Sequence, residues 1–358
     1  MANICIISDT IIKFDENNLK TGCGGSETWI IKIAEAYAEL GHNVSILVNC
    51  DTHKQNDKIS WHYIGEINDV LSTVKFDAIV ISRVITKNLV AILEHYNYTN
   101  LYIIAHDTYL ISEQGKPIYY DNLNDYSKNN IKKIFVLSEL HKQLFINEWK
   151  FPENILEISA NGLDFELLDK YSNNTERDNS ILWSIRYERH FNVLADKLAP
   201  IIRKYIPDFK IYVCSYGDGP DKKYENYDYI INLGKLSKDE LYKEMSKHKV
   251  YFHPMLFFET FCISILEGIM CGCNIITAYN YGAATTLMPY KGFLLPTNID
   301  YNNTQDCSYV ALKIINGIFE YNSEENKSLR TSMQTYLKNM YSWKKIAIDM
   351  LKTMKIDS

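Results

Sequence analysis

The sequence predicts an α/β protein with two domains, each built on a parallel β-sheet. Its length of 358 residues exceeds that of one ordinary domain. Short apolar runs alternate with longer amphipathic runs along the chain, the pattern of strand–helix–strand units. A polar run at residues 172–180 interrupts this alternation and marks a boundary between two halves.

The first half contains the clearer alternation. Apolar runs predict strands at residues 4–8, 44–48, 78–82, 101–105, 133–137 and 155–158. The run 26–40 places Trp29, Ile33 and Tyr37 on one face and predicts a helix that ends at Gly41. The second half repeats the pattern, with strands at 181–185, 209–214, 250–252 and 274–277, a helix that runs to residue 205, and an amphipathic helix at 340–354.

Composition excludes some classes of function. The formal net charge is −6 and the pI is about 5.9, whereas a nucleic-acid-binding domain is usually basic. The 8 cysteines form no C-x-x-C pair, and several fall in expected strands or buried helix. We therefore expect reduced core thiols and a cytoplasmic, reducing compartment. We expect no signal peptide and no transmembrane helix, which leaves peripheral contact with a membrane open.

The stretch 253–277 carries the strongest chemical signal. Glu259 follows a buried strand that stops at Pro254, and Glu267 lies within the apolar helix that comes next. If this helix begins near Glu259, its amino-terminal N–H groups at residues 260–262 offer a phosphate site. Glu267 would then lie about 12 Å along the axis. The two carboxylates would bind the two ends of one extended ligand, with a diphosphate between them.

The alternative for this stretch is a core helix with two surface glutamates. Glu267 weakens that alternative, because it lies among Ile263, Ile265, Leu266 and Ile269, where a carboxylate needs a partner.

Three further groups follow the ends of expected strands. Gly24 and Gly25 precede the first long helix, a layout typical of dinucleotide sites. His106 and Asp107 follow one strand. His106 is a general base, a hydrogen-bond donor to the sugar or an ordinary loop histidine, and Asp107 could orient it. Arg186 and Arg189 follow another strand, and two guanidinium groups suit a diphosphate unless they are solvated surface charges.

Several of these motifs together resemble a known family. The pattern Glu259-x7-Glu267, the GG-x-E element that ends at Glu27 and the NG-x-D turn at residues 161–164 resemble retaining GT-B glycosyltransferases of glycosyltransferase family 4 (group 1). The resemblance implies two Rossmann-like domains with parallel sheets that face each other across a cleft. The implied boundaries are 1–168 for an N-terminal, acceptor-side domain, 169–340 for a donor domain, and 341–358 for a helix that packs back on the first domain.

The resemblance also implies roles for single residues. Glu267 would hold the ribose hydroxyls, and Glu259 would bind the donor sugar near its reacting face. Glu27 would lie on the acceptor side. Either His106 or Asp107 would be the functional group at the strand end of the first domain, and the choice between the two is left open. The other implied donor contacts are Gly24, Gly25, Arg186, Arg189, Gly217, Gly234, Leu236, Thr260, Phe261 and Cys262.

Two positions depart from the family pattern. His190 stands where the family usually has glycine, and Thr285 stands where it often has glutamate. Gly162, in the turn between domains, is expected to supply a permissive backbone.

The resemblance implies the function of a retaining, metal-independent hexosyltransferase. It would move a sugar from a nucleotide diphosphate sugar, with a UDP-sugar as the first choice, to a glycan, glycolipid or glycoprotein acceptor. The chain has no Asp-x-Asp, and no cofactor or metal is expected. The alternatives are a non-catalytic nucleotide-sugar binder, a GT-B nucleotide-sugar 2-epimerase, and a glycosidase with paired carboxylates.

Overall fold

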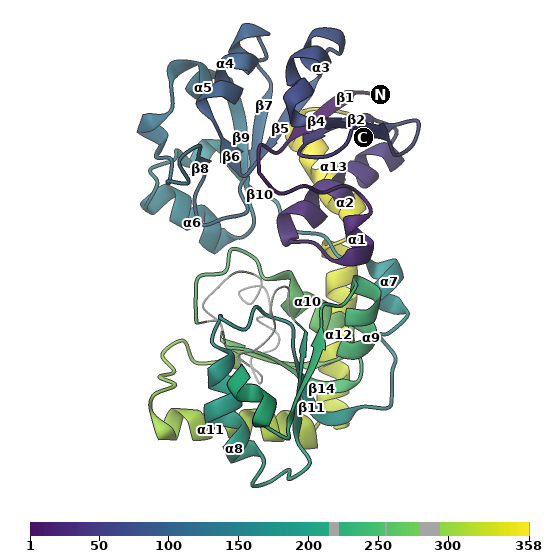
Figure 1. Ribbon diagram of the computed structural model, residues 1–358, viewed down its shortest axis with the longest axis vertical. Helices are drawn as coiled ribbons and strands as arrows, with labels where there is room; N and C mark the ends of the chain where they lie inside the picture. Colours follow the sequence, from purple (N-terminus) through teal and green to yellow (C-terminus); the bar gives the residue numbers. More distant parts are fainter. Residues whose placement is uncertain (215–221, 255, 279–281, 283–293, 358) are drawn as a thin grey trace. The chain divides into compact units, whose positions relative to one another are not determined.

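A computed structural model describes residues 1–214, 222–254, 256–278, 282 and 294–357 (Figure 1). The chain divides into two compact units. The first unit comprises residues 1–19, 23–162 and 341–358, and the second comprises residues 20–22 and 163–340.

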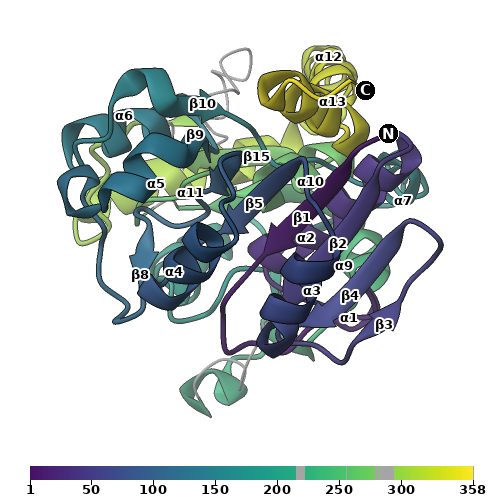
Figure 2. The ribbon, with the colours of Figure 1, turned by 90° about the horizontal axis from the view of Figure 1, so that it is seen from above.

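The first unit is built on an eight-stranded sheet in the order β10-β9-β7-β5-β1-β2-β4-β3, and Figure 2 shows β4, β2, β1 and β5 side by side. All neighbours are parallel except the edge pair β3–β4. Its strands are β1 (Asn3–Ile7), β2 (Asn43–Val48), β3 (His53–Lys54), β4 (Ile59–Tyr63), β5 (Ala78–Ser82), β7 (Leu101–Ile104), β9 (Ile131–Val136) and β10 (Leu156–Ile158), and β6 (Val84–Ile85) pairs separately with β8 (Ile111–Ser112). The helices between residues 1 and 162 are α1 (Asn18–Thr21), α2 (Gly25–Glu39), α3 (Ile67–Thr73), α4 (Lys87–His95), α5 (Asp125–Asn130) and α6 (Glu139–Asn147).

Helices cover both faces of this sheet. Cys5 and Ile7 of β1 belong to an apolar cluster that includes side chains of α3 and α4. Side chains alternate between faces along a strand, so Tyr102, which lies between two members of this cluster, points to the opposite face. Its hydroxyl donates to the carbonyl of Met354 (3.3 Å), at the end of α13 (Trp343–Met354). Helix α13 also packs against α2, so the last helix of the chain completes the first unit (Figure 1).

Gly162 has a different role from the one expected. Its φ lies outside the left-handed region, so no special backbone conformation requires glycine there. A Cβ atom at this position would instead lie 2.4 Å from Cδ2 of Trp343. Glycine is needed because the first residue of α13 packs directly on the backbone.

The second unit is built on a six-stranded parallel sheet in the order β13-β12-β11-β14-β15-β16. The strands are β11 (Asp178–Trp183), β12 (Lys210–Cys214), β13 (Ile230–Gly234), β14 (His248–His253), β15 (Asn274–Ala278) and β16 (Leu294–Leu295). The helices are α7 (Phe165–Asp169), a π-helix (Val193–Leu198) that continues into α8 (Ala199–Ile202), α9 (Lys238–Met245), α10 (Ile263–Met270), α11 (Thr304–Phe319) and α12 (Glu324–Met340).

The predicted α/β class with parallel sheets in two domains is confirmed. Every expected strand is present, with ends shifted by up to about three residues. The structure adds strands that the sequence analysis did not predict, among them β4 and β13, and the helix expected to reach residue 205 ends at Ile202. All eight cysteines are free thiols, and six of them are buried.

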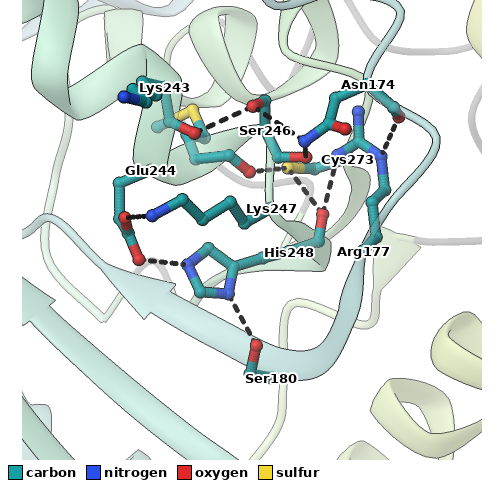
Figure 3. A network of polar contacts seen from close by, with 10 residues as sticks. Asn174, Arg177, Ser180, Lys243, Glu244, Ser246, Lys247, His248 and Cys273 are labelled. Carbon is teal, nitrogen blue, oxygen red and sulfur yellow. Dashed lines mark hydrogen bonds and ion pairs between the residues drawn. The ribbon is translucent and has the colours of Figure 1, made fainter.

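A polar network joins β11, β14 and the end of α9 inside the second unit, as Figure 3 shows. His248 shares a hydrogen bond between Nδ1 and the Ser180 hydroxyl (2.7 Å), and its Nε2 lies 3.6 Å from Oε1 of Glu244. Glu244 also pairs with Lys247. The Ser–His–Glu order is that of a hydrolase triad, but Ser180 is only 3% exposed within a strand. The network therefore ties secondary-structure elements together rather than presenting a nucleophile.

The close approach of Trp343 to Gly162 gives a first prediction. Gly162→Ala should lower the free energy of unfolding by about 1–3 kcal/mol, because the added methyl group overpacks the contact with α13. Gly25→Ala is the matched control, since a Cβ there meets no atom within 4 Å. Urea unfolding of the three proteins measures the difference, and equal stability of Gly162→Ala and the unchanged protein would contradict the prediction.

A second prediction concerns pH. His248, and then Lys247, hold the pKa of Glu244 at about 2 against the opposing effect of burial. A carboxyl group with a lowered folded-state pKa stabilises the protein above its unfolded pKa of about 4.5 and loses that contribution as pH falls toward 2. Glu244→Gln should therefore cost about 1–3 kcal/mol at pH 7 and roughly half as much at pH 3.

Glu324→Gln is the control for this measurement, because it removes the same charge from a side chain that is 92% exposed. Urea unfolding followed at pH 7, 5, 4 and 3 compares the variants. A cost for Glu244→Gln that does not change with pH would show that the charge of Glu244 contributes nothing to stability.

Candidate functional site

The central stretch of the second unit lies between the end of β14 and the start of α10. The loop carries Glu259, and α10 begins only at Ile263. Cys262 precedes the helix with φ +66° and ψ +71°, a left-handed conformation from which a right-handed helix cannot extend backwards. The prediction that the helix begins near Glu259 is therefore wrong. The first helical N–H groups belong to Ile263 and Ser264, and the expected axial separation of Glu259 and Glu267 no longer applies.

Glu259 is paired with an arginine from another strand end. Arg189 donates from Nη1 to Oε1 of Glu259 (2.8 Å), and its guanidinium lies 4.5 Å from the ring centre of Phe257. The Glu259 side chain is 19% exposed and that of Arg189 is 47% exposed. Burial raises the pKa of Glu259, and the charge of Arg189 opposes this effect. The structure thus brings together two of the residues predicted from the sequence, one cation and one carboxylate.

The turn that carries Arg189 keeps the shape that a glycine would provide. His190, at the position where the family usually has glycine, adopts φ +67°. Histidine is among the residues that tolerate this region better than most. The backbone N–H of Arg189 donates to the carbonyl of Arg186 (2.9 Å) and closes the turn. Arg186 itself is 61% exposed and lies 3.5 Å from Glu188, so only Arg189 is held beside Glu259.

Glu267 is buried in α10, with 2% of its surface exposed. Its Oε1 accepts hydrogen bonds from Nζ of Lys238 (2.6 Å) and from the hydroxyl of Tyr242 (2.6 Å). Both donors lie on α9, which begins with a capping box between Ser237 and Glu240. The partner that a carboxylate needs in this apolar helix is therefore a pair of donors on the neighbouring helix.

The other predicted donor contacts of the second unit lie near this pair in the chain. Gly234 ends β13 with φ +69°, and Leu236 is half-buried two residues before Lys238. Thr260 and Phe261 lie in the loop before α10, and Phe261 is 2% exposed. Gly217 and Thr285 lie outside the described residues.

The glycine pair of the first unit begins α2. Gly24 is its N-cap and Gly25 its first residue. Glu27, 7% exposed, folds its carboxylate back over Gly24, where a Cβ would lie 2.3 Å from Oε2 of Glu27. A side chain at position 24 would force the Glu27 carboxylate to shift. The hydroxyl of Ser26 donates to Oε1 of Glu27 (3.1 Å).

Asp107 is held by an arginine that the sequence analysis did not single out. Arg83 follows the end of β5 and donates from Nε and Nη2 to the two carboxylate oxygens of Asp107 (2.8 and 3.2 Å). It also donates to Ser26 (3.2 Å) and lies 3.8 Å from Glu27. Arg83 adopts φ +69°, a conformation that bulky residues keep only when their surroundings enforce it. A basic residue directly after a buried strand was the signal that could have identified it.

His106 lies beside this cluster but is enclosed. Its ring makes an edge contact with Trp29, with 5.5 Å between ring centres. Burial, with the charge of Arg83, lowers the pKa of His106 to about 3. The imidazole is therefore neutral at pH 7, whereas the carboxylate of Asp107 is engaged by Arg83.

The described residues contain neither a cluster of metal ligands nor a membrane-spanning helix. No group of three or more His, Cys, Asp or Glu side chains in this part of the chain could hold a metal ion. Among the same residues, no helix has both the length and the apolar character needed to cross a membrane.

Part of the second unit matches a known protein family. Residues 172–306 match the family described as "Glycosyl transferases group 1". This segment contains Arg186, Arg189, Lys238, Glu259 and Glu267. A search of curated proteins finds no significant match to the sequence.

Solved structures resemble the whole chain at low sequence identity. A sucrose-phosphate synthase from Thermosynechococcus elongatus has a TM-score of 0.67 at 15% identity, over 99% of this chain and 98% of that one. A glycosyltransferase from Rickettsia africae gives 0.68 at 16% identity, with coverage of 99% and 98%. HepE from Anabaena, solved in complex with UDP-glucose, gives 0.65 at 14% identity, with coverage of 99% and 100%.

These likenesses show the fold. The chain has the GT-B fold of glycosyltransferases, and residues 172–306 of its second unit match the glycosyl transferases group 1 family.

Proposed function

We propose that the protein is a glycosyltransferase that moves a hexose from a nucleotide diphosphate sugar to an acceptor hydroxyl. The observation that carries this proposal is the arrangement around α10 within the matched segment. A cation, Arg189, is fixed beside Glu259 ahead of the helix, and Glu267 is held inside the helix by Lys238 and Tyr242. Groups suited to a diphosphate therefore lie ahead of the start of α10, and a carboxylate suited to a diol lies within the helix.

Arg189 is proposed to stabilise the departing diphosphate. During transfer the bond between C1 of the sugar and the diphosphate oxygen breaks, and the diphosphate leaves with the electron pair. The acceptor oxygen then bonds to C1, and its proton is taken up by the departing diphosphate. Guanidinium offers five N–H donors, and the structure engages only one of those of Arg189 in a hydrogen bond to a described residue, Glu259. The remaining donors suit phosphate oxygens, and the N–H groups at the start of α10 add to them.

The carboxylates receive the sugar and the nucleoside in this proposal. Glu259 would bind hydroxyls of the donor sugar, and Glu267 would bind the ribose. A UDP-sugar is the first choice of donor, since HepE was solved with UDP-glucose and the fold is shared. Retention of configuration at C1 and independence of divalent metal are parts of the same proposal, with cationic side chains neutralising the diphosphate in place of a metal ion.

The first unit is proposed to supply the acceptor side. Arg83 and Asp107, which follow β5 and β7, form a charged cluster with Glu27 of α2, with one cation between two carboxylates. Such a cluster can accept hydrogen bonds from the hydroxyls of a glycan, a glycolipid or a glycoprotein. Reaction in the cytoplasm, alone or at a membrane surface, fits the free cysteines and stays part of the proposal.

Nucleotide binding is the first test. UDP, GDP and ADP should be screened by thermal shift and calorimetry, with and without EDTA. A ligand at 100 times its Kd adds about 2.7 kcal/mol to stability, so one nucleotide should raise the unfolding temperature, and EDTA should not change the effect. If none of the three nucleotides binds under either condition, the proposed function is wrong.

The role of Arg189 gives a sharper prediction. Arg189→Ala should lower turnover by about 10²–10³-fold, because it removes a group that stabilises the leaving diphosphate, and should weaken donor binding much less. Turnover is followed as release of UDP from UDP-glucose with water as the acceptor, and donor affinity is measured by calorimetry.

Arg203→Ala is the matched control, since Arg203 is a partly buried arginine of the same unit that also pairs with a carboxylate, Asp228, and has no role in the proposed site. Equal turnover for Arg189→Ala and the control would show that Arg189 does not stabilise the departing diphosphate. Nucleotide-sugar binding by the unchanged protein, without release of UDP, would instead favour the non-catalytic binder.

A further inference from the structure

Glu267 uses its two carboxylate oxygens differently. Oε1 accepts both hydrogen bonds, from Lys238 and from Tyr242, each at 2.6 Å. Oε2 receives none from any residue that the structure describes. A carboxylate whose one oxygen is saturated by two donors presents the other as its acceptor.

We propose that Lys238 and Tyr242 are positioning residues that fix Glu267 so that Oε2 meets the vicinal hydroxyls of a ribose. This inference rests on the proposed function. It states that residues outside the Glu259–Glu267 motif contribute to the protein's preference for nucleotides that carry both ribose hydroxyls. Neither residue needs to touch the nucleotide, because both act through Glu267.

The two donors are placed by the geometry of one helix. Lys238 is the first residue of α9, and Tyr242 follows four positions later, so both side chains lie on the same face. The capping box of Ser237 and Glu240 fixes the start of this helix and therefore the position of Lys238 along the helix axis. Two donors from one rigid face leave the carboxylate little freedom to rotate.

The hydroxyl of Tyr242 remains a donor at physiological pH. Tyr242 is 3% exposed, and burial, together with the charge of Glu267, raises its pKa well above the ordinary value. The hydroxyl therefore keeps its proton and can only donate to a carboxylate. The ammonium of Lys238 supplies the opposite charge that a buried carboxylate requires.

The group lies at the margin of the core. Ile265, Leu266 and Ile269 surround Glu267 in α10 and are fully buried, whereas the Lys238 side chain keeps 19% of its surface exposed. A purely structural role for α10 would be served by an apolar residue at position 267, because replacing a buried ion pair by apolar side chains is often neutral or stabilising. The retained charges point to a ligand with hydroxyl groups.

The test compares a nucleotide with its analogue that lacks both ribose hydroxyls. The nucleotide that binds the unchanged protein most tightly is first chosen from UDP, GDP and ADP. Calorimetry then gives Kd for that nucleotide and for its 2′,3′-dideoxy form. Tyr242→Phe and Lys238→Met should each bind the nucleotide about tenfold more weakly, while their affinity for the dideoxy form should change little. The ratio of the two affinities should therefore fall about tenfold.

A double-mutant cycle shows whether the effect passes through Glu267. In a Glu267→Ala background, Tyr242→Phe should cause no further loss of nucleotide affinity. Tyr321→Phe and Lys197→Met serve as controls, because they remove a buried hydroxyl bonded to the Gly272 carbonyl and a lysine bonded to residues 301 and 302. Their affinity ratio should equal that of the unchanged protein.

The outcomes separate this inference from the proposed function. Suppose that the unchanged protein binds a nucleotide but that Tyr242→Phe and Lys238→Met lower the affinity for the nucleotide and for its dideoxy form by the same factor. The two residues are then merely structural, and the inference is overturned. A full tenfold loss for Tyr242→Phe in the Glu267→Ala background also overturns it. If no nucleotide binds the unchanged protein, the proposed function fails, and the inference fails with it.

Discussion

Burial of the parallel strands on both faces decides where charged side chains can lie in this protein. In β1 and β14 the central residues have no exposed surface, for example Ile6 and Tyr251. A charge within such a strand would lose its hydration without compensation. Two charged pairs lie instead just beyond the carboxyl ends of strands, the edge that open α/β sheets use for ligands, whereas Glu244 and Lys247 pair at the amino end of β14. In the first unit Arg83 and Asp107 follow β5 and β7, and in the second Arg189 and Glu259 follow β11 and β14. One physical constraint thus produces the polar cluster of each unit.

Glu267 is the exception, and it shows how a helix can carry a charge into the core. Its neighbours along α10 are apolar, so compensation has to come from a different element. The sequence reveals the need for a partner but not its identity, because α9 and α10 are separated by β14 and only their packing brings Lys238 and Tyr242 to the carboxylate. Local patterns can predict a carboxylate that needs a donor. They cannot predict the donor.

The same limit separates the predictable from the unpredictable parts of the fold. Strands buried on both faces were predicted, because continuous apolar runs specify them. Strands β4 and β13 were not, because each mixes apolar and polar residues over only five positions and depends on a neighbouring strand for its definition. The motif residues Glu259, Glu267 and Arg189 were located from spacing and resemblance. The left-handed Cys262 that delays α10, the left-handed His190 that replaces a glycine, and the Trp343 contact that requires Gly162 arise from tertiary structure.

The return of α13 to the first unit has a consequence for synthesis. Helix α2 is made early, but the helix that packs on it is made only after all of residues 163–340. At roughly 5–20 residues per second, the ribosome takes about 10–40 s to add that stretch. During this time the apolar surface of α2 that α13 later covers stays open to solvent and to other chains. The first unit to emerge is therefore completed only after the whole second unit has been made.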